Sequence, residues 1–265
     1  MVEKESQKRI RTGLFFVTLL IIGLSMPTLY SAYASMSVPG VEKGIVYSAS
    51  YVVKGMGGAP TFSELKKAGF TFVGTIAYLD WKTKDWNQAT KWIKSARDAG
   101  FVTFIDFWAD ANLAVDMAKR AASTGADILA FDEFLTYYHM SQIQLQTIIN
   151  ASLSVNSKLQ FILNEPASDQ VRNAYEWTAK YPFVRIATDH YYDKTIIDLG
   201  IQLSRTYGKK PAAWLIFAGG SESFDCSTHL DDWLTYVKQR QVDTLFWMVD
   251  KEGTWPAQWQ KVAGF

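Results

Sequence analysis

The chain has 265 residues, and its 27 Lys and Arg residues nearly balance its 26 Asp and Glu residues. Because the charge is close to neutral and no basic stripe is present, we expect no nucleic-acid partner. Cys226 is the only cysteine, which excludes a disulfide framework within the chain and a Cys-based zinc site.

The first 34 residues have the pattern of a targeting segment. A basic start is followed by "GLFFVTLLIIGLSM", which runs from Gly13 to Met26 without a charge, and then by the small-x-small triplet Ala32-Tyr33-Ala34. A membrane-spanning helix needs about 20 apolar residues, so this shorter stretch predicts a secretory signal peptide cleaved after Ala34. An uncleaved anchor is the alternative, and only then would we expect a membrane contact. In both cases residues 35–265 are predicted to form one domain, secreted or held at the cell surface.

Eight apolar runs of strand length follow along the chain. They are "GIVYSASYV" from Gly44, "FTFVGTIAYL" from Phe70, "FVTFIDFW" from Phe101, "ADILAFDEF" from Ala126, "LQFILNEP" from Leu159, "FVRIATDHYY" from Phe183, "AAWLIFAGG" from Ala212 and "VDTLFWMVD" from Val242. Their apolar content is nearly continuous rather than alternating, which is typical of parallel strands that are covered on both faces.

The stretches between these runs carry the signals of helices. Residues 61–64 (Thr-x-x-Glu) and 141–144 (Ser-x-x-Gln) match the capping box, in which side chains bond the unpaired N–H groups of the first turn. Gly69, Gly100 and Gly125 stand where helices are expected to end. Strands and helices therefore alternate along the whole domain.

Eight strand–helix units in a domain of this size predict an α/β fold, the (β/α)8 TIM barrel. A doubly wound open sheet is the alternative fold. That fold normally has a glycine-rich phosphate loop after its first strand, and "KGMGGAP" at residues 54–60 does not match the G-x-G-x-x-G pattern.

Carboxylates stand at the ends of most of the predicted strands. They are Asp80, Asp106, Asp132, Glu133, Glu165, Asp189, Glu222 and Asp250. In a barrel these strand ends form the active-site face, and glycoside hydrolysis needs two carboxyl groups, one on each side of the scissile bond. We therefore predict Asp132 and Glu133 as the central catalytic residues. Asp189 is the preferred partner acid, and Glu165 is the second choice.

Other polar and aromatic residues at the same strand ends are candidates for binding a sugar. Asp106, Asn164 and His190 are predicted to orient the sugar or to tune the carboxyl groups. Flat rings stack on the apolar C–H faces of sugars. The aromatic candidates are Trp108, Tyr137, Tyr191, Trp214 and Trp247.

The tripeptide Asn-Glu-Pro at residues 164–166 carries the acid/base glutamate in a large clan of barrel glycosidases. In that clan the motif closes the fourth strand and a partner glutamate closes the seventh. Here it closes the fifth predicted strand, and the seventh ends in Ala-Gly-Gly at residues 218–220. An endo-β-glucanase or mannanase of that clan, with Glu165 as its acid, is kept as an alternative function.

A second resemblance covers more of the chain. "GADILAFDEF" followed one unit later by "LQFILNEP" resembles the spherulin-4-like glycosidases, glycoside hydrolase family 135 and its relatives. The resemblance rests on Asp132, Glu133, Leu163 and Asn164, and it implies a barrel that cleaves amino-sugar polysaccharides of the extracellular matrix. The chain departs from the family pattern at Glu165, which separates the asparagine from the proline, and at the sixth strand, which ends in Asp-His at residues 189–190.

The leading hypothesis is therefore an exported glycoside hydrolase whose partner is a polysaccharide. A barrel that binds polysaccharide without cleaving it would use the same acids and aromatics, so it remains an alternative. A metal-dependent hydrolase is disfavoured, because three histidines without a His-x-His or His-Glu-x-x-His motif do not make a dedicated site. We expect neither a metal ion nor another cofactor.

Overall fold

The computed structural model describes residues 42–47, 60–76, 86–107, 111–166, 169–181, 183–189, 194–217 and 230–249. All of them belong to one compact unit, Val41–Phe265. The predicted signal peptide or anchor, and the boundary after residue 34, lie outside these ranges and stay predictions. In the part of the chain that is described, no helix combines the length and apolar character needed to cross a membrane.

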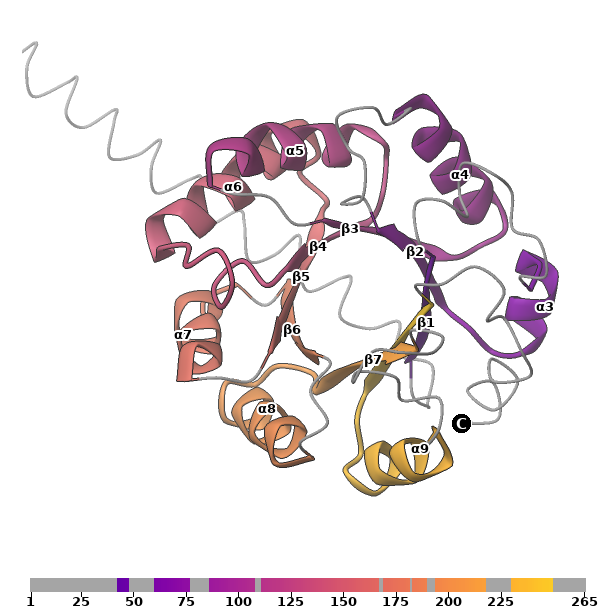
Figure 1. Ribbon diagram of the computed structural model, residues 1–265. Helices are drawn as coiled ribbons and strands as arrows, with labels where there is room; N and C mark the ends of the chain where they lie inside the picture. Colours follow the sequence, from indigo (N-terminus) through magenta and orange to yellow (C-terminus); the bar gives the residue numbers. More distant parts are fainter. Residues whose placement is uncertain are drawn as a thin grey trace, which may run out of the picture. The chain divides into compact units, whose positions relative to one another are not determined.

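Eight parallel strands form a closed barrel in chain order (Figure 1). The strands are β1 (Glu42–Tyr47), β2 (Phe72–Ile76), β3 (Val102–Phe107), β4 (Ile128–Asp132), β5 (Gln160–Pro166), β6 (Val184–Asp189), β7 (Ala212–Phe217) and β8 (Thr244–Val249). The last strand pairs with the first, from Glu42 opposite Thr244 to Tyr47 opposite Val249. This closure confirms the predicted TIM barrel and rules out the open sheet.

Helices surround the barrel on its outside (Figure 1). They are α3 (Phe62–Lys67), α4 (Trp86–Asp98), α5 (Ala111–Ser123), α6 (Gln142–Val155), α7 (Asp169–Thr178), α8 (Lys194–Thr206) and α9 (Leu230–Gln239). Both predicted capping boxes are formed, at Thr61 before α3 and at Ser141 before α6. Gly69, Gly100 and Gly125 have positive φ angles of 78°, 83° and 83°, as expected for residues that end a helix.

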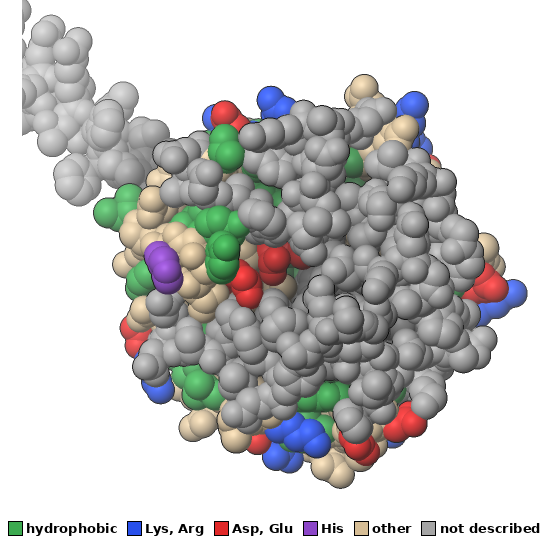
Figure 2. Space-filling view, viewed as in Figure 1, with side chains coloured by type: hydrophobic (Ala, Val, Ile, Leu, Met, Phe, Trp, Pro, Cys, Tyr) green, Lys and Arg blue, Asp and Glu red, His purple; other side chains and the backbone are tan. Residues whose placement is uncertain are grey.

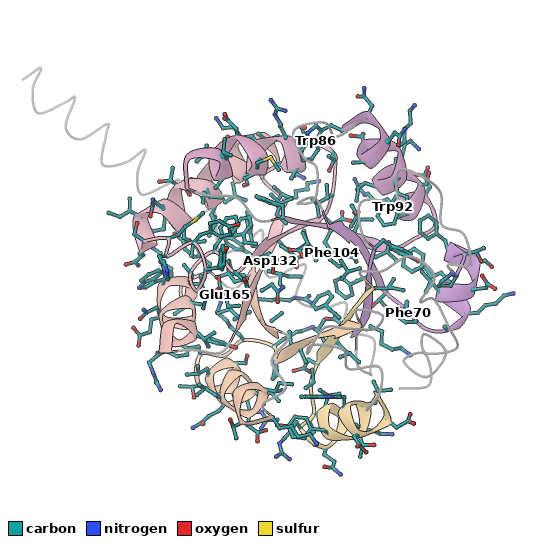
Figure 3. The ribbon with its side chains drawn as sticks, viewed as in Figure 1. Phe70, Trp86, Trp92, Phe104, Asp132 and Glu165 are labelled. Atoms are coloured by element: carbon teal, nitrogen blue, oxygen red, sulfur yellow. The ribbon has the colours of Figure 1, made fainter. Side chains whose placement is uncertain are left out.

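The inside of the barrel is filled by a buried cluster to which every strand contributes and no helix does. The cluster consists of Val46, Phe72, Phe104, Ile128, Ala130, Ile162, Ala187, Ala212 and Phe246. Figure 3 shows Phe104 within the ring of strands, whereas Phe70 and Trp92 lie outside it, toward the helices. Since successive residues of a strand point to opposite faces, this cluster fixes which positions of each strand face inward.

The two ends of the barrel differ in chemistry. At the end where the strands begin, Arg185 Nη1 donates a hydrogen bond of 2.7 Å to Glu42 Oε2, and Thr244 Oγ1 donates one of 3.0 Å to the same oxygen. These charges are paired, so this end is closed by a polar network. At the end where the strands finish, acidic side chains gather around β3, β4 and β5.

Candidate functional site

Three of the predicted site residues point toward the inside of the barrel at the carboxyl ends of neighbouring strands. Asp106 on β3 is two residues beyond Phe104, Asp132 on β4 is two beyond Ala130, and Asn164 on β5 is two beyond Ile162. Each therefore shares the inward face of a residue in the barrel cluster. Asp106 and Asn164 are almost fully buried, at 1% and 2% exposed. The predicted convergence of these polar groups at one end of the barrel is thus formed.

Asn164 joins the ends of β4 and β5 through both its side chain and its backbone. Its Nδ2 donates a 2.8 Å hydrogen bond to Asp132 Oδ1, and its carbonyl oxygen accepts one of 2.8 Å from Glu133 N. Within the described residues, no donor reaches Asn164 Oδ1, although the atom is buried. Buried acceptors normally have a partner, so this oxygen is one of a few exceptions among the buried side-chain polar atoms of the described residues.

Glu133 stands where the chain leaves β4, as the first residue of the β4–α6 loop (residues 133–140). Its φ of 51° is left-handed, which is uncommon for a residue other than glycine. The Glu133 carbonyl accepts hydrogen bonds of 3.0 and 3.2 Å from the N–H groups of Tyr137 and Tyr138. The predicted strand ran on through this residue, whereas the observed strand ends one residue earlier because the backbone turns here. The side chain is partly exposed next to Asp132.

Glu165 lies on the face of β5 opposite to that of its neighbour Asn164. Its side chain is completely buried, and it accepts hydrogen bonds from Leu135 N (2.9 Å), Thr136 N (3.1 Å) and Thr136 Oγ1 (2.9 Å). Burial raises the pKa of this carboxyl to about 8; the hydrogen bonds act in the opposite direction, and the nearby charge of Glu133 adds to the rise. Asp132 lies opposite Asn164, the neighbour of Glu165, and Figure 3 labels Asp132 and Glu165 on the adjoining strands β4 and β5.

The β4–α6 loop is anchored by aromatic packing and presents one ring to solvent. Phe134 is buried and stacks on Phe131 with the ring centroids 4.9 Å apart and 7° between the planes. Tyr137 is 67% exposed, and its ring meets that of Tyr138 edge to face, with centroids 5.0 Å apart. Figure 2 shows acidic side chains beside hydrophobic ones near the middle of the visible face. Tyr137 lies four residues beyond Glu133, and an exposed flat ring of this kind can stack on the apolar face of a sugar.

The remaining predicted site residues are only partly described. Trp108, His190 and Tyr191 lie outside the described residues. For Asp189, Trp214 and Trp247 the structure describes the backbone and not the side chain. Asp189 closes β6 opposite Pro166, Trp214 lies on β7 opposite Phe246, and Trp247 lies on β8 opposite Ile45.

The sequence did not reveal the partners of Glu165. Leu135 and Thr136 precede it by 30 and 29 residues, and they offer backbone N–H groups, which every residue except proline has. Only the strand position of Glu165 carried a signal: it follows Asn164, and neighbours on a strand face opposite ways. Once Asn164 is known to face inward, Glu165 must face the helix layer.

The described residues contain no group of three or more His, Cys, Asp or Glu side chains placed to hold a metal ion. What this end of the barrel offers instead is carboxyl groups, one amide and an exposed tyrosine ring. Such groups can exchange protons and bind hydroxyl groups and apolar sugar faces.

Solved structures share the fold of this chain at low sequence identity. A mutant form of Thermotoga maritima Cel5A in complex with cellobiose matches with a TM-score of 0.59 and 12% identity, over 84% of this chain and 96% of that one. A fungal β-1,4-galactanase matches with a TM-score of 0.52 and 14% identity, over 78% and 88%. A citrate synthase variant matches equally well in fold, with a TM-score of 0.52 and 11% identity, over 84% and 93%. No family model and no curated protein matches the sequence. The chain therefore has the TIM-barrel fold that glycoside hydrolases and other enzymes share.

Proposed function

We propose that this protein is a glycoside hydrolase that cleaves an extracellular polysaccharide. The observation that carries the proposal is the grouping of Asp132, Glu133 and Asn164 at the carboxyl ends of β4 and β5, with the exposed ring of Tyr137 on the loop that follows. The strand ends of a TIM barrel are where its active sites lie, and paired carboxyl groups are what glycoside hydrolysis uses.

Asp132 and Glu133 carry the chemistry, with Asp189 as the partner acid on β6. One carboxyl group protonates the oxygen of the leaving sugar, and another acts as the base or as the nucleophile. The hydrogen bond from Asn164 Nδ2 fixes the direction in which the Asp132 carboxyl points.

The substrate proposed is a polymer that contains amino sugars. This part of the proposal is supported by the resemblance of "GADILAFDEF" and "LQFILNEP" to the spherulin-4-like glycosidases. The N-terminal segment supports export, which would bring the enzyme into contact with such a polymer. The alternative clan, in which Asn-Glu-Pro closes the fourth strand, fits less well because the motif lies on β5 and its glutamate is buried.

A second candidate is a barrel that binds the polysaccharide without cleaving it. The exposed Tyr137 ring favours this candidate as much as the enzyme, because stacking on a sugar needs no catalytic group. Only cleavage separates the two candidates.

The test is the release of reducing ends from a panel of polysaccharides that includes galactosaminoglycans and β-glucans. The mature domain is compared with Glu133→Gln and with Asp116→Asn, a matched loss of one carboxylate at an exposed position on α5. We expect cleavage of one polymer class, a loss of at least about 100-fold in Glu133→Gln and no loss in Asp116→Asn. Retention on a polymer without any release of reducing ends would instead establish the binding barrel.

A further inference from the structure

The surroundings of Glu165 suit a side chain that accepts hydrogen bonds from the protein itself, rather than one that contacts the substrate. Its side chain is 0% exposed and lies on the face of β5 opposite to the inward-facing Asn164. Both carboxyl oxygens are occupied: Oε1 accepts from Leu135 N, and Oε2 accepts from the N–H and the hydroxyl group of Thr136. A substrate in the barrel mouth would have no free face of this carboxyl group to bind.

The two backbone N–H groups that donate hydrogen bonds to Glu165, those of Leu135 and Thr136, belong to the first turn of the β4–α6 loop. The other hydrogen bonds of that turn run from Tyr137 N and Tyr138 N to the carbonyl of Glu133, and from Met140 N to the carbonyl of Phe134. The hydrogen bonds of this turn leave the N–H groups of Leu135 and Thr136 without a partner inside it, and Leu135 is only 2% exposed, so water cannot supply the missing acceptor there. Glu165 supplies that acceptor from a different strand.

The residues held in this way stand between the two functional parts of the loop. Glu133 is two residues before Leu135, and Tyr137 directly follows Thr136. Glu133 also keeps a left-handed backbone, a conformation that persists only where the surroundings enforce it. The contacts that could enforce it are the bond from Glu133 N to the Asn164 carbonyl on one side and the Glu165 bonds on the other.

We propose that Glu165 is a positioning residue: its buried carboxyl group clamps the β4–α6 loop so that Glu133 and Tyr137 stand at the barrel mouth. The inference rests on the proposed function only in the roles given to Glu133 and Tyr137. The clamp itself concerns the loop and can be tested without a substrate.

A carboxyl group is suited to this task, and an amide is not. Three donors converge on the two oxygens of Glu165, and both oxygens keep lone pairs that can accept whether the carboxyl group is ionised or protonated. In Glu165→Gln one oxygen becomes an NH2 group, which is a donor and cannot accept from a backbone N–H. At least one loop amide then loses its partner, although the size of the side chain is unchanged.

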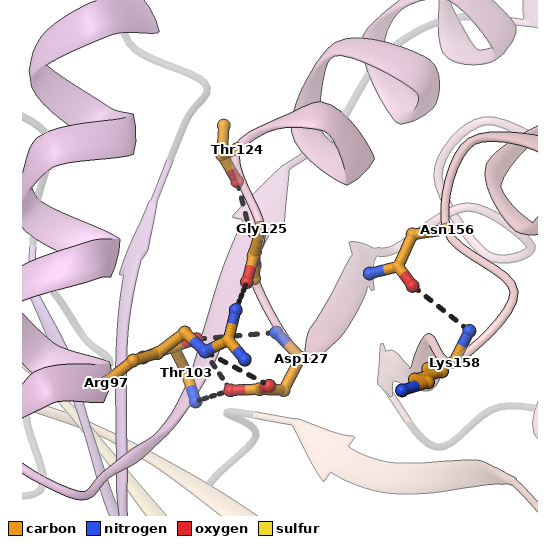
Figure 4. A network of polar contacts seen from close by, with 8 residues as sticks. Arg97, Thr103, Thr124, Gly125, Asp127, Asn156 and Lys158 are labelled. Atoms are coloured by element: carbon orange, nitrogen blue, oxygen red, sulfur yellow. Dashed lines mark hydrogen bonds and ion pairs between the residues drawn. The ribbon is translucent and has the colours of Figure 1, made fainter.

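The chain contains a matched control with the same chemistry at the opposite end of β4. Asp127 precedes the strand, and its Oδ2 accepts hydrogen bonds of 2.9 Å from Thr103 N and 2.8 Å from Thr103 Oγ1 (Figure 4). Like Glu165, it receives both the N–H and the hydroxyl group of one threonine. Asp127→Asn likewise turns one carboxyl oxygen into an NH2 group far from the proposed site. The oxygen that remains can keep both Thr103 contacts, and the ion pair of Arg97 Nε with Asp127 Oδ1, at 3.5 Å, is lost.

The experiment measures amide hydrogen exchange, residue by residue, in the mature domain and in Glu165→Gln, Thr136→Val and Asp127→Asn. We expect the Leu135 or Thr136 amide to exchange at least about 10-fold faster in Glu165→Gln, with protection of the β4 amides unchanged. Thr136→Val removes one donor of the clamp and keeps both N–H groups, so it should give a smaller effect if Glu165→Gln proves too unstable to study. Wild-type protection of both loop amides in Glu165→Gln would overturn the clamp.

The same variants are then assayed on the polysaccharide that the wild type cleaves. For Glu165→Gln we expect kcat to fall about 10-fold to 100-fold and KM to rise, because both the acid and the ring are displaced. Fewer folded molecules would lower the apparent kcat and leave KM unchanged, as we expect for Asp127→Asn. If the loop amides exchange faster in Glu165→Gln while its kcat and KM stay at the wild-type values, the positioning role is contradicted. If the wild type cleaves nothing, the exchange result still decides whether the clamp exists.

Discussion

The side-chain amide of Asn164 donates a hydrogen bond of 2.8 Å to Asp132 Oδ1, and the carbonyl of the same asparagine receives the N–H of Glu133 at 2.8 Å. One residue of β5 thus holds both members of the adjacent acidic pair on β4. The pair is fixed by contacts between neighbouring strands, and a catalytic site built on strands is held more precisely than one built on loops.

We first predict the effect of replacing the amide in this contact by a carboxyl group. In Asn164→Asp two carboxyl oxygens would meet at the distance of the present hydrogen bond, which is possible only if they share a proton. The pair should therefore ionise at higher pH, and the acidic limb of the kcat/KM profile should move up by about 1 pH unit or more. The check is a pH–rate profile beside that of Asn156→Asp, where the side-chain oxygen accepts from Lys158 N and an aspartate can do the same (Figure 4). Identical profiles for Asn164→Asp and the wild type would contradict the role of the contact.

The exposed ring of Tyr137 leads to a prediction about binding. Stacking of a sugar on this ring is expected to contribute about 1 kcal/mol, so Tyr137→Ala should weaken retention on the polysaccharide about 5-fold to 10-fold. Ile143→Ala is the control, since Ile143 is 75% exposed at the start of α6 and offers no flat ring. The measurement is affinity electrophoresis in gels that contain the polymer. Equal retention of the two variants would remove Tyr137 from the sugar site.

The raised pKa of Glu165 predicts how stability depends on pH. Between the ordinary value of 4.5 and about 8, the folded protein keeps this proton and the unfolded chain loses it. Unfolding then releases a proton, so the free energy of unfolding should fall as the pH rises, by at most about 1.4 kcal/mol per pH unit. This contribution to stability is complete below the ordinary value and is lost as the pH rises through about 8.

Urea unfolding of the wild type and of Glu165→Gln, from about pH 5 to about pH 8, checks that slope. Only the slope is compared, because the variant also loses a hydrogen-bond acceptor and is less stable at every pH. The wild type should lose stability over this range more steeply than the variant. Parallel curves would mean that Glu165 ionises in its ordinary range despite its burial.

The barrel interior leads to a prediction about packing. A Cβ atom added to Gly74 on β2 would lie 2.3 Å from the ring of Phe104, and that ring meets the ring of Phe246 with centroids 5.4 Å apart. Because the ring has little room to move, Gly74→Ala should cost about 1 to 3 kcal/mol of unfolding free energy. Denaturant unfolding measures the loss, and activity per folded molecule should be retained. A variant as stable as the wild type would show that the interior can repack.

Much of the fold could be predicted because its signals are local. Each of the eight strands overlaps an apolar run of the sequence, although β1 begins two residues before its run. The capping boxes before α3 and α6 depend on residues only three apart. The count of strands also placed Asn-Glu-Pro on the fifth strand, and this is confirmed. Strand ends were less accurate, since the left-handed turn at Glu133 ends β4 before the predicted run of residues 126–134 is complete.

The sequence could predict which residues lie at the candidate site, but not which contacts they make there. The sequence indicated that Asp132, Asn164 and Glu165 stand at neighbouring strand ends, because parallel strands finish at one end of a barrel. It could not indicate that Asn164 supports Asp132 while Glu165 turns away to hold the loop. That distinction depends on which face of β5 each side chain takes and on backbone N–H groups about 30 residues away.

The measurement that tests the central claim most directly is kcat/KM of Asp132→Asn and Glu133→Gln on the polymer that the wild type cleaves, beside Asp116→Asn. Circular dichroism and urea unfolding first establish that all three variants are folded. The account predicts that each of the first two loses at least about 100-fold in kcat/KM and that Asp116→Asn keeps the wild-type value. Wild-type activity in Asp132→Asn and in Glu133→Gln would contradict it, because the acidic pair that Asn164 holds would then take no part in the reaction.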